Sequence, residues 1–232
     1  MAYNLFSPWA QGHRIKTIVG HYGSGKTEIA LNMALNAPTE NREICLVDLD
    51  IVNPFFRSAE QGMRLKDGGV ELIAPPYALT GVDLPVLAAE VSSVFERKSL
   101  RVVFDVGGED AGATALGRFQ PEFSLNPSDF YYVVNTYRPY SSNVEQIIDM
   151  MARIAGRARM QFTGLINNGN MGVETTPKHV LHCQAMLEVV SERTGIPIVC
   201  ACAIESVIEQ MPEIAVPLFP LERMLMPEWL DL

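Results

Sequence analysis

A sequence of the form G-x-x-x-x-G-K-[ST], the pattern of a phosphate-binding loop, lies near the start of the chain. Such a loop binds phosphate only between a strand and a helix. The apolar run 15–19 predicts the strand, and residues 27–35 predict the helix. The loop's backbone N–H groups and the positive end of the helix would then surround an anion. The predicted phosphate-binding residues are Gly20, His21, Tyr22, Gly23, Ser24, Gly25, Lys26 and Thr27.

Two side chains at the end of this loop have the chemistry that a triphosphate requires. Lys26 is predicted to reach the β- and γ-phosphates, and the Thr27 hydroxyl is predicted to ligate Mg²⁺. The loop's three glycines have access to backbone angles that are closed to other residues, so the chain can wrap a phosphate closely. The loop therefore predicts a site for a nucleoside triphosphate with Mg²⁺.

The composition is that of an ordinary globular protein, with 232 residues, 48% of them hydrophobic and 19% charged. We expect one P-loop NTPase domain over residues 1–232, with the proline-interrupted residues 211–232 packed on it as a tail. The net charge of −9 disfavours broad binding to nucleic acid or to an anionic membrane. Residues 1–11 lack the pattern of a signal peptide, and no apolar run approaches a membrane span. With four cysteines expected to be free thiols, we predict a cytoplasmic protein.

Short apolar runs alternate with helical patterns along the rest of the chain. Most of the runs are continuous rather than alternating, as expected for strands that are covered by helices on both faces. This rhythm predicts an α/β fold: a three-layer, doubly wound, mainly parallel sheet of about seven strands. The predicted strands are 15–19, 44–47, 70–73, 101–105, 130–134, 162–166 and 198–202, and the predicted crossover helices are 83–97, 143–155 and 177–194.

Acidic residues follow two of these strands. Asp48 and Asp50 come after the second strand, and Asp105 ends the fourth strand just before a pair of glycines, Gly107 and Gly108. Because ligands bind at the carboxyl ends of parallel strands, these side chains are expected to face the phosphates. Asp105 would hold Mg²⁺ directly or through water. An aspartate at a strand end also commonly caps the next helix, which is the alternative for each acid taken alone.

Together the phosphate-binding loop, Asp48-Leu49-Asp50 and Asp105-Val106-Gly107-Gly108 resemble the MinD/ParA/nitrogenase-iron-protein group of P-loop ATPases. The resemblance extends from about residue 14 to about residue 210. It implies ATP and Mg²⁺ as cofactors, a homodimer, and slow hydrolysis that switches the affinity for a protein partner, such as one in cofactor or metal-enzyme maturation. The switch loops would be residues 50–60 and 106–120.

The same resemblance implies roles for individual residues. Asp50 would position or activate the attacking water, and Asp48 would support the Mg²⁺ shell that Asp105 completes. Gly108 would sense the γ-phosphate. The implied catalytic residues are Lys26, Asp48 and Asp50, and the implied metal ligands are Thr27, Asp48 and Asp105.

The chain departs from this group at residue 21. The group usually has a second lysine there, which reaches across a dimer to the partner's nucleotide, whereas this chain has His21. An imidazole is shorter and titrates near neutrality. Activation across a dimer would therefore be weaker, or it would depend on another residue such as Arg57 or Arg118.

An asparagine at the end of the sixth strand is the implied adenine-binding residue, with Asn167 the first choice and Asn168 the second. An amide has both a donor and an acceptor, which suits the adenine edge. The sequence Asn-Asn-Gly is also typical of a plain turn. Because the chain has no Asn-Lys-x-Asp sequence that would favour guanine, we expect ATP rather than GTP.

Two further features leave alternatives open. Cys200 and Cys202 would point to one face of a strand, where a dimer would present four sulfurs to a metal, but their apolar surroundings favour burial.

Two other functions are alternatives to the switch: a ligase or kinase that acts on a small metabolite, and a scaffold with negligible turnover. The acceptor pocket of such an enzyme would be lined by Phe55, Phe56, Arg57, Tyr137 and Arg138.

Overall fold

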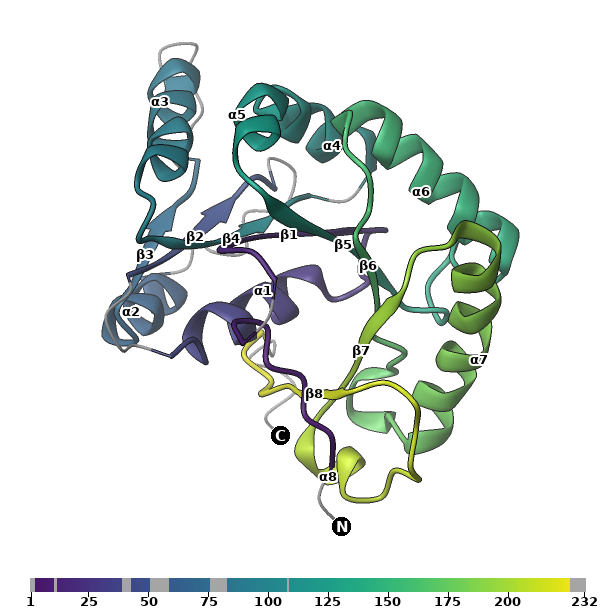
Figure 1. The fold of residues 1–232 in the computed structure, drawn as a ribbon. Coiled ribbons are helices and arrows are strands. Elements are labelled where there is room, and N and C mark those ends of the chain that lie inside the picture. The colour runs from purple at the N-terminus through teal and green to yellow at the C-terminus, as the bar shows by residue number, and fades with distance from the viewer. Residues whose placement is uncertain are drawn as a thin grey trace.

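The chain folds into three layers, with one parallel sheet between two layers of helices (Figure 1). The computed structural model describes residues 3–10, 12–38, 43–50, 59–75, 83–107 and 109–225. The strands are β1 (Ile15–Gly20), β2 (Ile44–Asp48), β3 (Val70–Ile73), β4 (Arg101–Asp105), β5 (Ser128–Val134), β6 (Gly164–Asn167), β7 (Ile198–Ala203) and β8 (Leu218–Pro220). They lie in the order β3-β2-β4-β1-β5-β6-β7-β8, and every neighbouring pair is parallel.

Helices cover both faces of the sheet. On one face lie α3, α4, α5, α6 and α7, and on the other lie α1 and α2 (Figure 1). Their bounds are α1 (Lys26–Leu35), α2 (Ala59–Asp67), α3 (Asp83–Glu96), α4 (Glu109–Gly117), α5 (Gln120–Leu125), α6 (Val144–Ala158) and α7 (Pro177–Thr194). A short 3₁₀ helix, η2 (Gly172–Glu174), precedes α7, and α8 (Glu205–Ile208) follows β7. No helix in the described ranges combines the length and the apolar character of a membrane span.

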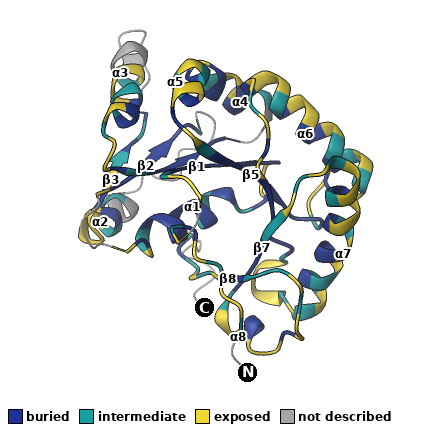
Figure 2. Ribbon diagram, in the orientation of Figure 1, coloured by how far each residue is buried: buried dark blue, intermediate teal, exposed yellow. Residues whose placement is uncertain are grey.

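Successive strand residues enter opposite cores, which explains the continuous apolar runs. Along β4, Val102 and Phe104 pack under α3 to α7, whereas Val103 packs against α1. All three side chains are fully buried. The strands accordingly form the buried centre of the molecule, shown in dark blue in Figure 2. In a strand that is buried on both faces, apolar side chains are favoured at every position, so the sequence shows a continuous apolar run and no alternation.

The predicted fold class is confirmed, and each of the seven predicted strands is present within a few residues of its predicted ends. The strand number was too low by one, because β8 adds an eighth strand at the edge beside β7. This strand has three residues and ends at Pro220, so it lacks the length and composition that mark a strand in a sequence. Pro220 is tolerated there because β8 is the last strand of the sheet and has only Leu218 bonded on its outer side, to residues 4 and 6.

The chain's path places the end of β1 at the centre of the sheet. The strands from β2 to β4 lie on one side of β1, and those from β5 to β8 lie on the other. Helices diverge from such a switch point and leave a crevice at the carboxyl ends of the strands. The loop from β1 to α1 lies at this edge of the sheet, together with the carboxyl ends of β2, β4, β5 and β6 (Figure 1).

Candidate functional site

The loop between β1 and α1 packs so tightly on its neighbours that two of its glycines are required. Gly25 has φ +90°, and a Cβ there would lie 2.2 Å from Nδ2 of Asn168. A Cβ on Gly20 would lie 2.4 Å from the carbonyl oxygen of Val133 in β5. No side chain fits at these distances. The motif's glycines therefore let the loop sit directly against β5 and the end of β6.

The Lys26 side chain folds back over the phosphate-binding loop at whose end it lies. Its side chain is buried, and Nζ donates to the carbonyl oxygen of His21 at 3.3 Å. The backbone N–H of Ser24 donates to the same oxygen at 3.1 Å. An ammonium held in this way is in place to bind phosphate oxygens, which form stronger hydrogen bonds with it than a neutral carbonyl does.

Thr27 and Asp105 meet at the start of α1. The Thr27 hydroxyl donates to Oδ2 of Asp105 at 2.7 Å, and Asp105 is 1% exposed. The other carboxyl oxygen, Oδ1, is buried and has no hydrogen-bond partner among the described residues. Burial raises the pKa of Asp105 to about 6, although the nearby ammonium of Lys26 and the hydrogen bond from Thr27 lower it.

These two side chains fit a magnesium ion. Mg²⁺ is usually bound through one or two carboxylates, with water and phosphate oxygens as its remaining ligands. Thr27 and Asp105 have a hydroxyl and an unpartnered carboxyl oxygen at one point of the loop. The described residues contain no group of three His, Cys, Asp or Glu side chains suited to a metal. An ion here would thus keep water and nucleotide oxygens among its ligands.

The other two acidic residues lie next to Asp105. Asp48 is the last residue of β2 and pairs in register with Asp105, and its Oδ1 accepts from the N–H of Asp50 at 2.7 Å. A Cβ on Gly107 would lie 2.8 Å from Oδ1 of Asp50, so the Asp50 carboxylate packs on that glycine. The structure thus brings together all three acids named from the sequence. Their catalytic and metal-binding roles stay predictions, and Gly108 lies outside the described residues.

His21 is turned into the protein. Its side chain is buried, Nδ1 lies 2.9 Å from the carbonyl oxygen of Tyr22, and its ring lies 5.8 Å from that of Tyr140. Of the two arginines proposed to replace a lysine at this position, Arg118 is exposed just after α4. Arg57 lies outside the described residues, as do Phe55 and Phe56 of the predicted acceptor pocket.

The two asparagines after β6 have different uses. The Asn167 amide donates to the carbonyl oxygen of Val180 and to Oε1 of Gln184, both at 3.0 Å, and accepts from the N–H of Gly169 at 3.0 Å. It is fully buried and joins β6 to α7. Asn168 Nδ2 donates to the carbonyl oxygen of Ser24 at 2.7 Å and so supports the phosphate loop. Adenine binding by Asn167 stays a prediction, and the structure describes another use of its amide.

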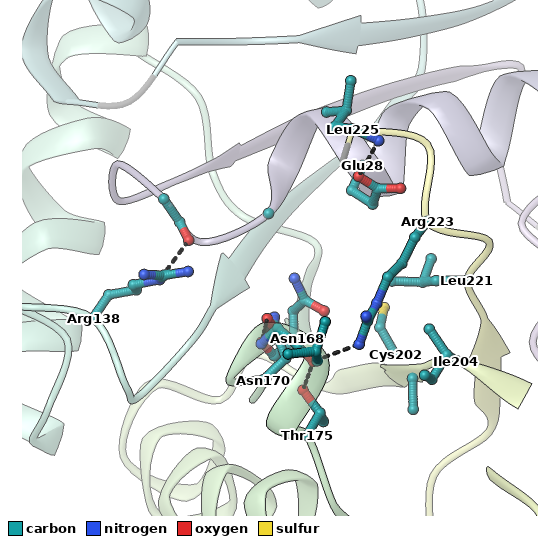
Figure 3. A pocket seen from close by; sticks show the side chains of 15 residues that line it. Glu28, Arg138, Asn168, Asn170, Thr175, Cys202, Ile204, Leu221, Arg223 and Leu225 are labelled. Atoms are coloured by element: carbon teal, nitrogen blue, oxygen red, sulfur yellow. Dashed lines mark hydrogen bonds between the residues drawn. The ribbon is translucent and has the colours of Figure 1, made fainter. Parts of the chain in front are cut away.

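A cavity of about 360 Å³ opens beside the loop (Figure 3). One wall contains Arg138, whose Nε donates to the carbonyl oxygen of Gly23 at 3.0 Å. The sequence pointed to Arg138 as part of an acceptor pocket, to Asn168 as the second choice for adenine and to Cys202 as a possible metal ligand, and it pointed to none of the cavity's other side chains. These include Glu28, Asn170, Thr175, Ile204, Leu221, Arg223 and Leu225.

The two cysteines of β7 lie in the core. Cys200 and Cys202 are 0% and 1% exposed, and Cys202 also borders the cavity. The burial expected from their apolar surroundings is confirmed. Burial and the neighbouring Cys200 raise the pKa of the Cys202 thiol well above its ordinary value. A neutral thiol of this kind is a poor nucleophile.

Asp105 is expected to make the stability of the nucleotide-free protein depend on pH. Its pKa of about 6 lies above the ordinary 3.8, so the folded protein binds this proton more tightly than the unfolded chain. The resulting stabilisation is complete below about pH 4 and is lost as the pH rises through about 6. Relative to Asp105→Asn, the wild type should lose about 3 kcal/mol of unfolding free energy as the pH rises from about 4 to neutral. Urea unfolding of both proteins in EDTA tests this, and curves that stay parallel with pH would contradict it.

Comparisons with known proteins identify the fold. No protein-family model and no curated protein matches the chain. Among solved structures, the cell division protein FtsY from Thermotoga maritima matches with a TM-score of 0.52 and 17% identity, over 88% of this chain and 66% of that one. Chloroplast FtsY from Physcomitrella patens matches with a TM-score of 0.52 and 15% identity, over 87% of this chain and 61% of that one.

A third match is the Signal Recognition Particle 54 kDa protein from Aeropyrum pernix, solved in complex with GDP. Its TM-score is 0.50 at 18% identity, over 83% of this chain and 41% of that one. This chain has a P-loop NTPase-like α/β fold, with an all-parallel sheet flanked by helices. It spans less than two thirds of the length of each of these three proteins. At such identities the likeness establishes the fold, and the function has to be argued from the site.

Proposed function

We propose that this protein binds ATP with Mg²⁺ and hydrolyses it slowly as a nucleotide-dependent switch for a protein partner. The contact between Thr27 and Asp105 at 2.7 Å carries the proposal. It joins the end of the phosphate loop to the end of β4 and leaves one buried carboxyl oxygen without a hydrogen bond. A solely structural pair would satisfy both oxygens, whereas a metal site needs a lone pair that is still available.

The cavity beside the loop supports binding of a whole nucleotide. It borders the phosphate loop at Gly23 and Gly25, and its far side is partly apolar, with Ile204 and Leu221 in its wall. Its volume of about 360 Å³ lies within the range of small-ligand pockets. We place the base and ribose in this cavity and the β- and γ-phosphates over the loop, near Lys26. ATP is proposed over GTP from the resemblance to the MinD/ParA group and the absence of an Asn-Lys-x-Asp sequence.

The packing of Gly107 against α4, and of α4 against α6, supports a switch. Gly107 follows β4, and a Cβ on Gly112 in α4 would lie 2.1 Å from the Gly107 carbonyl oxygen. The first turn of α4 therefore packs directly on this segment. Asp110 in that turn pairs with Arg153 and Arg157 of α6 at 3.1 and 3.2 Å. A shift of Gly107 when the γ-phosphate leaves would reach these exposed ion pairs and a partner bound there.

A homodimer is part of the proposal, on the resemblance to the MinD/ParA group, and a cytoplasmic location is part of it on the sequence features given above. The buried ring of His21 does not favour contact across such a dimer. An arginine or lysine side chain beside the γ-phosphate strongly accelerates phosphoryl transfer. NTPases that lack such a side chain hydrolyse slowly until a partner supplies it. We therefore expect a low basal rate that a partner protein increases.

Release of inorganic phosphate by the purified protein tests this function. Wild type with ATP and Mg²⁺ should turn over at less than about 1 s⁻¹, the low end of enzyme rates, and should show no turnover in EDTA. A pull-down from native extract with ATP, ADP or no nucleotide should then retain a protein in one state only. Turnover that requires a small acceptor and forms a new product would instead favour a ligase or kinase. No binding of any nucleotide would contradict the proposal altogether.

A further inference from the structure

A segment near the C-terminus, residues 221–225, crosses the start of α1 and closes one side of the cavity. We call this segment the strap. It follows directly on β8, and the close-up view shows Leu221, Arg223 and Leu225 opposite Asn168 and Asn170 (Figure 3). These three strap residues line the same cavity as Gly23 and Gly25. The strap is therefore a wall of the cavity that the proposed function fills with a nucleoside.

Two side chains of α1 fasten the strap to the helix that starts at the phosphate loop. The Glu28 carboxylate accepts from the backbone N–H groups of Met224 and Leu225. Asn32 Nδ2 donates to the carbonyl oxygen of Glu222 at 2.9 Å, and the Glu222 N–H donates to Oδ1 of Asn32 at 2.8 Å. Positions i and i+4 lie on one face of a helix, so both residues bind the strap from the same side.

These contacts are partly buried. Asn32 is fully buried, and burial is the main cause that raises the pKa of Glu28, although the two N–H groups lower it. A buried carboxylate or amide is costly without its hydrogen bonds. Glu28 and Asn32 therefore have a strong preference for the closed strap. The residue that follows the predicted Mg²⁺ ligand Thr27 thus holds the wall of the cavity.

Arg223 extends from the strap over the cavity. Its Nη2 donates to the carbonyl oxygen of Gly172 in the loop before α7, and this is its one hydrogen bond within the described part of the chain. Arg138 is anchored similarly, on the carbonyl oxygen of Gly23 at 3.0 Å. Both guanidinium groups border the cavity, together with the apolar side chains of Leu221 and Leu225. A planar guanidinium beside apolar side chains suits a flat aromatic ring that carries hydrogen-bond acceptors.

We propose that the strap is the nucleoside-binding wall of this site, in which Arg223 contacts the base and ribose of a purine nucleotide and Glu28 and Asn32 are positioning residues. This inference rests on the proposed function. A guanidinium has donors only, so it pairs with the acceptor nitrogens of the base or the oxygens of the ribose. Because coupling between two binding events is reciprocal, nucleotide and strap closure stabilise each other.

Hydrogen exchange with and without ATP and Mg²⁺ tests the coupling. The amides of Met224 and Leu225 donate to Glu28, so their exchange should slow at least about fivefold when nucleotide is bound. The first turn of α1 should be protected in the same experiment. Protection of α1 without protection of the strap would overturn this inference and leave the proposed function intact. Protection of neither would contradict the proposed function itself.

Substitutions separate contact from positioning. Arg223→Ala should raise the Kd for ATP about tenfold, measured by calorimetry, which corresponds to the loss of one charge-assisted contact. The control Arg193→Ala removes an exposed arginine paired with Glu145 and should leave the Kd within about twofold. Glu28→Gln should accelerate exchange of the strap amides before nucleotide is added. Arg223→Gln keeps two of the three methylene groups without the charge, and it should raise the Kd as Arg223→Ala does. An Arg223→Ala protein that is folded and binds ATP like wild type would overturn the inference.

Discussion

Lys26→Ala is expected to lower the affinity for ATP by at least about a hundredfold. The ammonium is buried at the loop and donates to the His21 carbonyl oxygen at 3.3 Å, within the region that the phosphates would occupy. Each hydrogen bond from a charged donor contributes about 1.5–3 kcal/mol, and the lysine would contact both the β- and the γ-phosphate. The loss of two such bonds corresponds to a factor of about a hundred or more. Calorimetric titration with ATP and Mg²⁺ measures it.

The control for this variant is Lys178→Ala. Lys178 is an exposed lysine in the first turn of α7, so its loss changes the net charge by the same amount without touching the loop. This protein should bind ATP within about twofold of wild type, because physiological salt screens an exposed charge outside the loop. Thermal unfolding of both variants verifies that they are folded. Equal affinities for the two variants would mean that the loop does not bind the phosphates.

Asp105→Ala is expected to abolish Mg²⁺-dependent hydrolysis, with a rate at least about a hundredfold below wild type. The Asp105 carboxylate accepts from Thr27 at 2.7 Å and has the buried oxygen that fits a metal ligand or its water. A bound Mg²⁺ would neutralise charge that develops on the phosphates, and a loss of about 3 kcal/mol in this stabilisation is about a hundredfold in rate. Phosphate release at saturating ATP and graded Mg²⁺ gives the rate and the metal dependence together.

Asp149→Ala serves as the matched control for this second variant. Asp149 is exposed on α6 and does not line the cavity beside the loop, so its removal should leave the rate within about twofold. The Asp105→Ala protein removes a buried charge, so it is expected to be folded and no less stable than wild type at neutral pH without nucleotide. A rate within threefold of wild type would exclude Asp105 from the metal site.

Much of the fold and the centre of the site could be predicted from sequence because they follow from local patterns. Strands buried on both faces read as continuous apolar runs, and β4 illustrates this with Val102, Val103 and Phe104 all buried. The carboxyl ends of parallel strands meet at one edge, so Asp48 and Asp105 had to come close to the phosphate loop once the alternation of strands and helices was recognised.

The features that were missed depend on contacts between distant parts of the chain. The edge strand β8 has only three residues, and its pairing with β7 brings the strap to α1. Glu28 and Met224 are separated by 196 residues, and no local pattern indicates that they meet. Adenine binding by Asn167 stays a prediction, but the contact of the next residue, Asn168, with the Ser24 carbonyl oxygen of the loop could not be read from the strand end. A shift of one position at a strand end changes which side chain faces the site.

Direct titration of the wild-type protein with ATP in the presence of Mg²⁺ tests the central claim most simply. We expect one nucleotide per chain with a Kd of about 100 μM or lower, equivalent to a binding free energy of about −5.5 kcal/mol or stronger. Omission of Mg²⁺ should weaken binding, because the site at Thr27 and Asp105 then has no cation to share with the phosphates. Absence of binding to both ATP and GTP up to about 1 mM, in a folded protein, would contradict the assignment of this loop as a nucleotide site.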